Sequence, residues 1–159
     1  IRSTYFNYKR DGVEGHGIME LEESFGGVEK EMSWRQIPHH YLDETLLAKY
    51  GKVEGNKLIL GNCAYEYIVF PKIYTMDKTS EKLLREFVKA GGKVLLTDEK
   101  PTWLEGEPFA YDYLESNVTW EEIVAAQPYT AARQEELYSC IRKEADGTLV
   151  INKAYSYFV

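Results

Sequence analysis

The chain has 159 residues, of which 44% are hydrophobic and 28% charged, and its formal net charge is -7. This length and composition suit a globular protein with a real hydrophobic core. The acidic balance argues against nucleic acid or an anionic membrane as a partner, because no surplus of basic residues is present to neutralise phosphates. No apolar run approaches the roughly 20 residues that span a bilayer. We therefore expect no nucleic acid and no membrane among its partners.

The chain begins at Ile1 without an initiator methionine or a signal peptide, which predicts an excised piece of a longer protein or a processed product. Its two cysteines, Cys63 and Cys140, are too few for a disulfide framework. Two reduced structural thiols are expected, which favours the cytoplasm without fixing the compartment of the parent protein. A glycosylation sequon begins at Asn117, but such tripeptides are common by chance and decide nothing.

The first half of the chain predicts a long helix, a short helix and a hairpin. Apolar residues at spacings of three and four predict one helix face, interrupted by Gly26 and Gly27 at a cost of about 1 kcal/mol each. Residues 39–43 are predicted to be a short strand or an extended segment, after which Asp43 caps a helix over residues 44–50. Turn signals between residues 52 and 66 predict a hairpin. The apolar face of the long helix comprises Ile18, Leu21, Phe25, Val28 and Met32.

Residues 65–97 read as one complete strand–helix–strand unit. Tyr67 to Phe70 is an unbroken apolar run, as expected of a central parallel strand that is covered on both faces. Asp77 and Thr79 are candidate caps for the helix that follows, and a pair of glycines ends it. Lys93 to Thr97 is the second apolar strand. Such a unit predicts an open α/β sheet.

After Thr97 the pattern is looser. Residues 101–113 are predicted to be an irregular loop rich in aromatic side chains. Thr119 and Glu122 form a capping box that begins a short helix. Turn residues at Asp146-Gly147 lie between two apolar runs and predict a β-hairpin. We expect an α/β domain over residues 1–128 and a β-rich extension, or the start of a following β domain, over residues 129–159.

Ligands of open α/β sheets bind at the carboxyl ends of the strands, which here are residues 71–75 and 98–101. Neither segment carries a glycine-rich phosphate-binding motif. His39 and His40 should point to opposite faces of an extended segment, so we expect one partly buried and one exposed histidine and no metal site. Cys63 lies in a predicted hairpin turn before its strand, whereas a cysteine nucleophile on an elbow needs a strand, a sharp turn and then a helix. We therefore expect no catalytic residue, no metal ligand and no cofactor. The candidate ligand contacts are Tyr74, Asp98 and Trp103.

Carboxylates are numerous, with 26 Asp and Glu residues. A glycosidase pair needs carboxyl groups about 5–5.5 Å or about 6.5–9.5 Å apart, and sequence neighbours such as Asp98 and Glu99 rarely meet that geometry. Aromatic side chains between Trp103 and Trp120 either stack on sugar rings or pack onto their own domain. The acidic residues of the first helix are most simply its solvated side: Glu20, Glu22, Glu23, Glu29 and Glu31.

Several groups of residues spread over the first hundred positions form a recognisable pattern. They are Ile1-Arg2-Ser3 with Tyr5 and Asn7-Tyr8, Tyr41 to Glu44 with Leu47, Tyr50 to Glu54, Leu58 to Gly61, Tyr65 to Pro71, and Phe87 to Val94. Together they resemble the accessory α/β domain of certain bacterial glycoside hydrolases, the β-galactosidase trimerisation domain, which is itself similar to the class I glutamine amidotransferase fold. The resemblance covers residues 1–126. It implies a flavodoxin-like or amidotransferase-like three-layer sandwich with a mostly parallel sheet, to which the predicted C-terminal β-hairpin is added.

In such hydrolases the catalytic carboxylates sit on a (β/α)₈ barrel that precedes this domain, and none falls in the matching segment. The resemblance therefore implies a non-catalytic accessory domain that scaffolds or oligomerises a glycoside hydrolase. Its expected partners are the adjacent catalytic barrel of the same polypeptide, a second copy of the chain, and carbohydrate. One alternative is a stand-alone carbohydrate- or small-ligand-binding module. Another is a small amidotransferase-like enzyme that uses Cys63 or Cys140, although the Cys–His–Glu triad is not matched.

Overall fold

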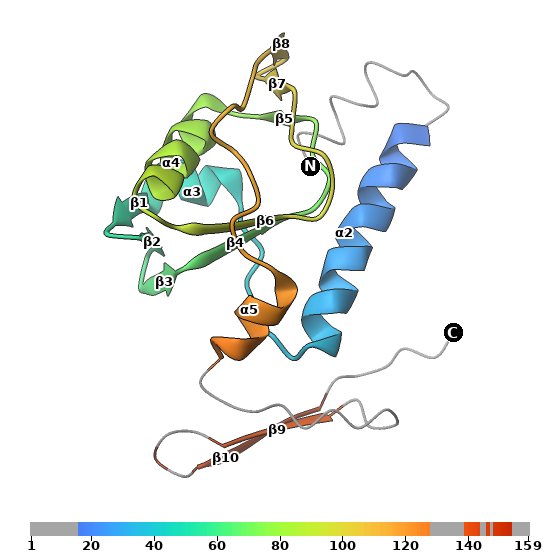
Figure 1. Ribbon diagram of the computed structural model, residues 1–159, viewed down its shortest axis with the longest axis vertical. Helices are drawn as coiled ribbons and strands as arrows, with labels where there is room; N and C mark the ends of the chain where they lie inside the picture. Colours follow the sequence, from blue (N-terminus) through green and yellow to red (C-terminus); the bar gives the residue numbers. More distant parts are fainter. Residues whose placement is uncertain (1–15, 128–138, 144–145, 147, 154–159) are drawn as a thin grey trace.

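The computed structural model describes residues 16–127, 139–143, 146 and 148–153 (Figure 1). In this part of the chain no helix is long and apolar enough to cross a membrane. Ile1 to Tyr8, which contribute to the resemblance, and the predicted domain boundary at residue 128 lie outside the described residues, as does the side chain of Cys140. The helices are α2 (His16–Trp34), α3 (Glu44–Tyr50), α4 (Lys78–Lys89) and α5 (Trp120–Ala125). The strands are β1 (Gly51–Glu54), β2 (Lys57–Leu60), β3 (Cys63–Tyr65), β4 (Tyr67–Phe70), β5 (Thr75–Met76), β6 (Lys93–Leu96), β7 (Trp103–Leu104), β8 (Glu107–Pro108), β9 (Ser139–Lys143) and β10 (Leu149–Lys153).

The centre of the fold is the predicted strand–helix–strand unit. β4 and β6 pair in parallel, with Tyr67 opposite Lys93 and Phe70 opposite Leu96, and α4 connects them. Asp77 is the N-cap of α4, because its carboxylate accepts a hydrogen bond from the backbone N–H of Ser80 at 2.8 Å. The unit predicted from the sequence is therefore confirmed, and Asp77 is the cap.

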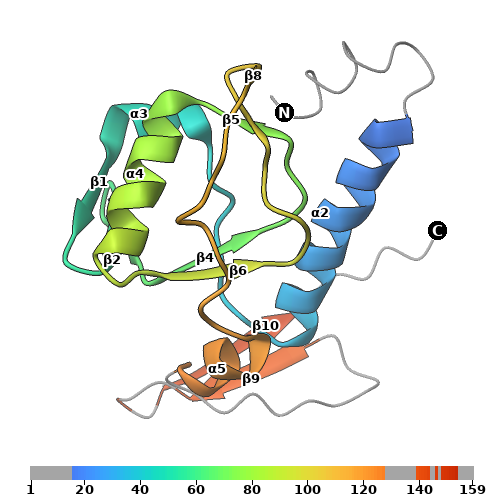
Figure 2. The same cartoon turned by 45° about the horizontal axis from the view of Figure 1, so that its top comes forward.

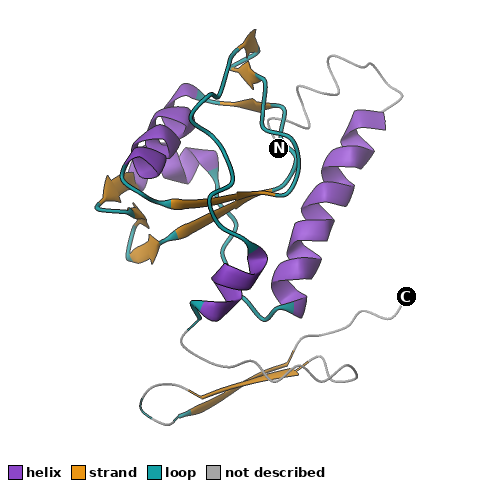
Figure 3. Ribbon diagram, in the orientation of Figure 1, coloured by secondary structure: helices purple, strands orange, loops and turns teal. Residues whose placement is uncertain are grey.

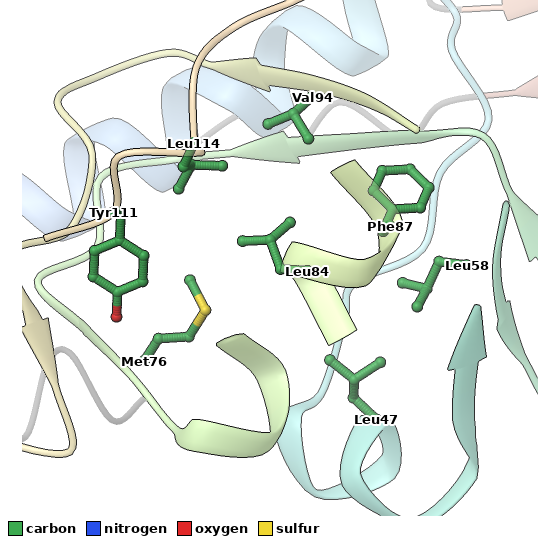
Figure 4. Close-up of a cluster of buried hydrophobic side chains, with 8 residues drawn as sticks. All are labelled: Leu47, Leu58, Met76, Leu84, Phe87, Val94, Tyr111 and Leu114. Atoms are coloured by element: carbon green, nitrogen blue, oxygen red, sulfur yellow. The ribbon is translucent and has the colours of Figure 1, made fainter. Parts of the chain in front are cut away.

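Two hydrophobic cores cover the two faces of the β4–β6 pair. In Figures 1 and 2, α3 and α4 lie on one side of the pair, and α2 and α5 lie on the other. Figure 4 shows the first core, in which side chains of α3, α4 and β6 meet those of the segment that follows β8. Its buried members are Leu47, Leu58, Met76, Leu84, Phe87, Val94, Tyr111 and Leu114. The buried members of the second core are Met32, Ile37, Leu95, Val118 and Ile123.

The predicted flavodoxin-like or amidotransferase-like sandwich with a mostly parallel sheet is wrong. The described strands form four separate sheets of two or three strands. Only β4–β6 and β5–β7 are parallel pairs there, whereas β1–β2, β2–β3, β7–β8 and β9–β10 are antiparallel. The hairpin strands β1 to β3 form an antiparallel sheet of their own and do not join the central pair, so the central sheet consists of β4 and β6 alone.

Side chains end the central sheet at β6. The backbone N–H of Val94 donates to Oδ1 of Asn117 at 2.7 Å, and the backbone N–H of Leu96 donates to Oγ of Ser116 at 2.9 Å. Asn117 also donates from Nδ2 to the carbonyl oxygen of Gly92 at 3.1 Å. Because these groups satisfy the outer edge of β6, no further strand is needed on that side.

Local signals predicted most of the remaining elements. Asp43 caps α3 by accepting from the backbone N–H groups of Thr45 and Leu46, both at 2.9 Å, and Thr119 with Glu122 forms the capping box of α5. The hairpins β1–β2–β3 and β9–β10 are also confirmed. The stretch predicted as an irregular loop contains the short strands β7 and β8, although much of residues 97–119 is loop (Figure 3). Residues 38–43 belong to no helix or strand, and the backbone of Asp43 is extended.

Helix α2 runs unbroken through Gly26 and Gly27, and a Cβ atom added at either position would meet no atom within 4 Å. We therefore expect Gly26→Ala and Gly27→Ala each to raise the free energy of unfolding by about 0.4–1 kcal/mol, because alanine restricts the unfolded chain and suits a helix interior. Urea unfolding followed by circular dichroism measures this change. Gly91→Ala is the control and should destabilise, since Gly91 has φ of +88°. A loss of stability at Gly26 or Gly27 would contradict the expectation.

Candidate functional site

The candidate site lies where β4 and β6 end, and α2 packs against it. Tyr74 follows β4 and Asp98 follows β6, as the sequence predicts. No direct bond joins these two side chains; both are held by α2. The hydroxyl of Tyr74 donates to Oε2 of Glu20 at 2.9 Å, and the hydroxyl of Ser24 donates to Oδ2 of Asp98. Glu20 and Ser24 share a face of α2 because they are four residues apart.

Lys72 is the centre of this arrangement. Its ammonium donates to Oε2 of Glu20 at 2.7 Å and lies 5.8 Å from the ring centroid of Tyr74. Its backbone N–H donates to Oγ of Ser24 at 2.7 Å. The hydrogen bond that Lys72 donates to Glu20 is the main cause that raises the pKa of Lys72 above its usual value. We call Glu20, Ser24, Lys72, Tyr74 and Asp98 the strand-end cluster.

The contacts of the strand-end cluster attach α2 to the ends of β4 and β6 and do not form a catalytic arrangement. A serine nucleophile needs a base that takes its proton, and the ammonium of Lys72 is instead paired with Glu20. Neither His39 nor His40 contacts Ser24. Nδ1 of His39 contacts the carbonyl oxygen of Ile37, and Nδ1 of His40 contacts the hydroxyl of Tyr65. As expected, His39 is partly buried and His40 is exposed.

Trp103, the third predicted contact, lies on β7 beside Tyr74 in the backbone. Its N–H donates to the carbonyl oxygen of Tyr74 at 3.1 Å, and its carbonyl oxygen accepts from the hydroxyl of Tyr111 at 2.8 Å. The Trp103 side chain is half-buried. The structure thus places Tyr74 and Asp98 in one polar cluster. Trp103 lies in the adjoining β5–β7–β8 sheet and is not a member of that cluster.

The other aromatic residues of this stretch pack onto their own domain. The ring of Tyr111 is buried in the first core, with its centroid 4.8 Å from that of Phe109 and 6.4 Å from that of Tyr113. The guanidinium of Arg85 lies 4.3 Å from the ring centroid of Tyr113. Trp120 packs against the second core. These contacts leave less aromatic surface for stacking on a sugar than the sequence suggests.

Burial raises the pKa of Tyr111 and of Tyr113 above the usual value near 10, and the charge of Glu81 adds to both shifts. A raised folded-state pKa contributes stability that is complete below the unfolded-state pKa and is lost as the pH rises through the folded-state pKa. Above pH about 10, stability should therefore fall by about 1.4 kcal/mol per pH unit for each of the two tyrosines.

Tyr111→Phe should reduce the loss of stability above pH 10 by the contribution of one tyrosine, about 1.4 kcal/mol per pH unit. At neutral pH it should lower the free energy of unfolding by about 1 kcal/mol, because the hydrogen bond to Trp103 is lost. Urea unfolding between pH 8 and pH 11 measures both effects. Tyr50→Phe is the matched control because the Tyr50 side chain is exposed, and it should leave the slope unchanged. Curves for Tyr111→Phe and the unmodified chain that stay parallel up to pH 11 would contradict the expectation.

Cys63 is a free, exposed thiol at the start of β3, and it interacts with the side chain of Tyr65. The Tyr65 hydroxyl also contacts Nδ1 of His40 at 2.8 Å, so these three side chains form a small exposed group away from the strand-end cluster. In the described part of the chain no group of three or more His, Cys, Asp or Glu side chains could hold a metal ion. The sequon asparagine, Asn117, uses its side-chain amide to close the edge of β6. A glycan on Nδ2 would displace the bond to Gly92.

Sequence reasoning missed three members of the strand-end cluster. Glu20 was assigned to the solvated side of the first helix, and Ser24 and Lys72 were given no role. A usable signal was the spacing of four residues between Glu20 and Ser24, which puts two polar groups on one helix face. No protein-family model, no curated protein and no solved structure matches this chain.

Proposed function

We propose that this chain is a non-catalytic accessory domain of a larger carbohydrate-processing hydrolase, in which it scaffolds the catalytic domain. The observation that carries the proposal is that every side chain of the strand-end cluster is engaged in fastening α2 to the ends of β4 and β6. A catalytic group must instead be able to reach a substrate. The resemblance to accessory domains of glycoside hydrolases supports the class of the parent protein.

The distribution of exposed apolar side chains supports contact with another folded unit. In the described part of the chain, the large apolar side chains that are exposed all lie between residues 19 and 50, on α2, α3 and the segment between them. They are Met19, Phe25, Trp34, Tyr41, Leu42, Leu46 and Tyr50. Two of them, Phe25 and Tyr41, lie side by side with ring centroids 5.3 Å apart, and adjoining exposed apolar side chains mark contacts with other proteins or domains.

The proposal is tested by incubating the chain with a panel of p-nitrophenyl glycosides and by titrating mono- and oligosaccharides against tryptophan fluorescence. We expect no turnover above background and no saturable fluorescence change up to millimolar sugar. Turnover that Asp98→Asn abolishes would overturn the proposal, because it would make the strand-end cluster catalytic. Saturable sugar binding without turnover would favour the stand-alone carbohydrate-binding module instead.

Asp98→Asn should lower the free energy of unfolding by about 1 kcal/mol, because it weakens the bond from Ser24 that holds α2. Urea unfolding measures the loss. The matched control is Glu99→Gln, which removes a neighbouring exposed carboxylate that makes no hydrogen bond or ion pair with the described residues. Equal stability of the two variants would mean that Asp98 does not fasten α2.

A further inference from the structure

Two arginine side chains of this fold are each held by an aromatic ring and a glutamate together. Within the described residues, both arginines lie against a ring and pair with the glutamate four positions earlier in the chain. The guanidinium carbon is 5.5 Å from the ring centroid in one group and 4.3 Å in the other, and the ion-pair distances are 2.8 Å and 2.6 Å. A guanidinium makes both contacts because it is planar and charged. The two groups are Arg35 with Trp120 and Glu31, and Arg85 with Tyr113 and Glu81.

Around Phe25 on α2, exposed rings and glutamates lie together, and no lysine or arginine of the described residues pairs with them. The ring centroids of Phe25 and Tyr41 are 5.3 Å apart, and the two side chains are 49% and 63% exposed. Glu22 lies three positions before Phe25 and Glu29 four positions after it, so both are its neighbours on the helix surface. Both glutamates are exposed and make no hydrogen bond or ion pair with the described residues. We call Phe25, Tyr41, Glu22 and Glu29 the aromatic–acidic patch.

The aromatic–acidic patch suits an arginine better than any other side chain. Lys30 follows Glu29 directly, and side chains one position apart on a helix do not face each other, so this lysine does not fill the patch. An apolar partner would bury the two carboxylates without pairing them, which costs free energy. A small hydrated cation would leave the rings uncovered. An arginine meets both needs, because its stem and planar head cover a ring while its charge pairs with a carboxylate.

We propose that the aromatic–acidic patch is a docking site for a basic segment of a partner protein that carries two arginines. The arginines stack on the rings of Phe25 and Tyr41 and pair with Glu22 and Glu29. The two glutamates are seven positions apart on α2, which is about 10.5 Å along the helix axis. In an extended segment, arginines three positions apart span about 10 Å and therefore match that spacing. The proposal goes beyond the accessory function and does not depend on the parent protein being a hydrolase.

Binding is measured with a capped six-residue peptide that has arginine at its second and fifth positions and alanine or leucine elsewhere. The control peptide has citrulline in place of each arginine, which keeps the length and shape of the side chain and removes its charge. Each peptide is titrated into the full chain at low ionic strength, and the backbone amide signals around Phe25 and Tyr41 are followed by nuclear magnetic resonance.

The matched control variant removes the same charge outside the patch. It combines Glu23→Gln with Glu86→Gln, because both glutamates are exposed and their side chains make no hydrogen bond or ion pair with the described residues. Glu23 lies on α2 but is two positions from Phe25, which places it on another face of the helix. The test variant combines Glu22→Gln with Glu29→Gln.

We expect the arginine peptide to shift the signals saturably with a dissociation constant of about 1 mM, and the citrulline peptide to bind about tenfold more weakly or less. The test variant should also bind the arginine peptide about tenfold more weakly, because both ion pairs are lost. Tyr41→Ala should weaken binding about fivefold, because one of the rings that attract the cation is lost. The control variant should change the affinity by less than about twofold.

No saturable shift at several millimolar arginine peptide would overturn the proposal. So would equal binding of the two peptides, since charge would then play no part, or unchanged affinity in Tyr41→Ala, since the rings would then play none. Equal weakening by the test and control variants would show an unspecific attraction to an acidic chain and would overturn it as well. Shifts at the patch that appear on raising the protein concentration alone would show that a second copy covers it, in place of the arginine segment.

Discussion

Phe87→Ala should lower the free energy of unfolding by about 3–5 kcal/mol, the largest loss we expect from any single substitution in this chain. The side chain of Phe87 is 0% exposed and projects from α4 into the first core, where Leu84 and Val94 are among its neighbours (Figure 4). Truncation removes the buried ring and leaves a cavity, because close-packed side chains relax only partly into the space.

Urea unfolding at neutral pH measures this loss. The matched control is Val88→Ala on the next position of α4, where the side chain is only partly buried, and it should cost about 1 kcal/mol. Similar losses for the two variants would mean that the ring of Phe87 is not packed as described. The ring of Phe87 also packs closely against Gly92: a Cβ atom at position 92 would overlap the ring, so a larger residue there would displace it.

The elements that depend on neighbouring residues were predictable from the sequence. Asp43 and Asp77 cap the helices that follow them, and the Thr119 capping box begins α5, because each cap is a contact between residues two or three positions apart. The strand–helix–strand unit was predictable for the same reason, since its two strands and its helix each carry their own pattern.

The sheet was not predictable, because the number of strands depends on which distant segment reaches each edge. Nothing in the apolar run Lys93–Leu96 indicates that Ser116 and Asn117 will close its outer edge with their side chains. The resemblance implied further parallel strands beside β4 and β6, but the central sheet has only these two strands. Whether a strand or side chains cover the edge of β6 depends on contacts between residues about 20 positions apart in the sequence.

The sequence predicted some members of the strand-end cluster and missed the others. Tyr74 and Asp98 follow from the rule that functional side chains gather at the carboxyl ends of parallel strands. Glu20 and Ser24 reach that place from α2 through contacts with residues about 50 to 75 positions away, and acidic residues on a helix look like a solvated face from the sequence alone. Phe25 shows the reverse error: its position on the apolar face predicts burial, yet its side chain is 49% exposed.

Asn117→Ala should lower the free energy of unfolding by about 2–3 kcal/mol, since it leaves two backbone groups at the edge of β6 without partners. Oδ1 of Asn117 accepts from the N–H of Val94, and Nδ2 donates to the carbonyl oxygen of Gly92. Val94 and Gly92 are both buried, so water cannot readily replace the lost bonds. The cost of an unsatisfied buried group therefore exceeds the worth of an ordinary surface hydrogen bond.

Asn117→Asp separates the two bonds, because aspartate keeps an acceptor for Val94 but loses the donor to Gly92. We expect its stability at neutral pH to lie between those of the unmodified chain and Asn117→Ala, as measured by urea unfolding. Amide exchange adds a local test: in Asn117→Ala the N–H of Val94 should lose protection while that of Leu95, which faces β4, keeps it. If Asn117→Ala were as stable as the unmodified chain, the edge of β6 would not depend on this side chain, and its closure could no longer explain why the sheet ends after two strands.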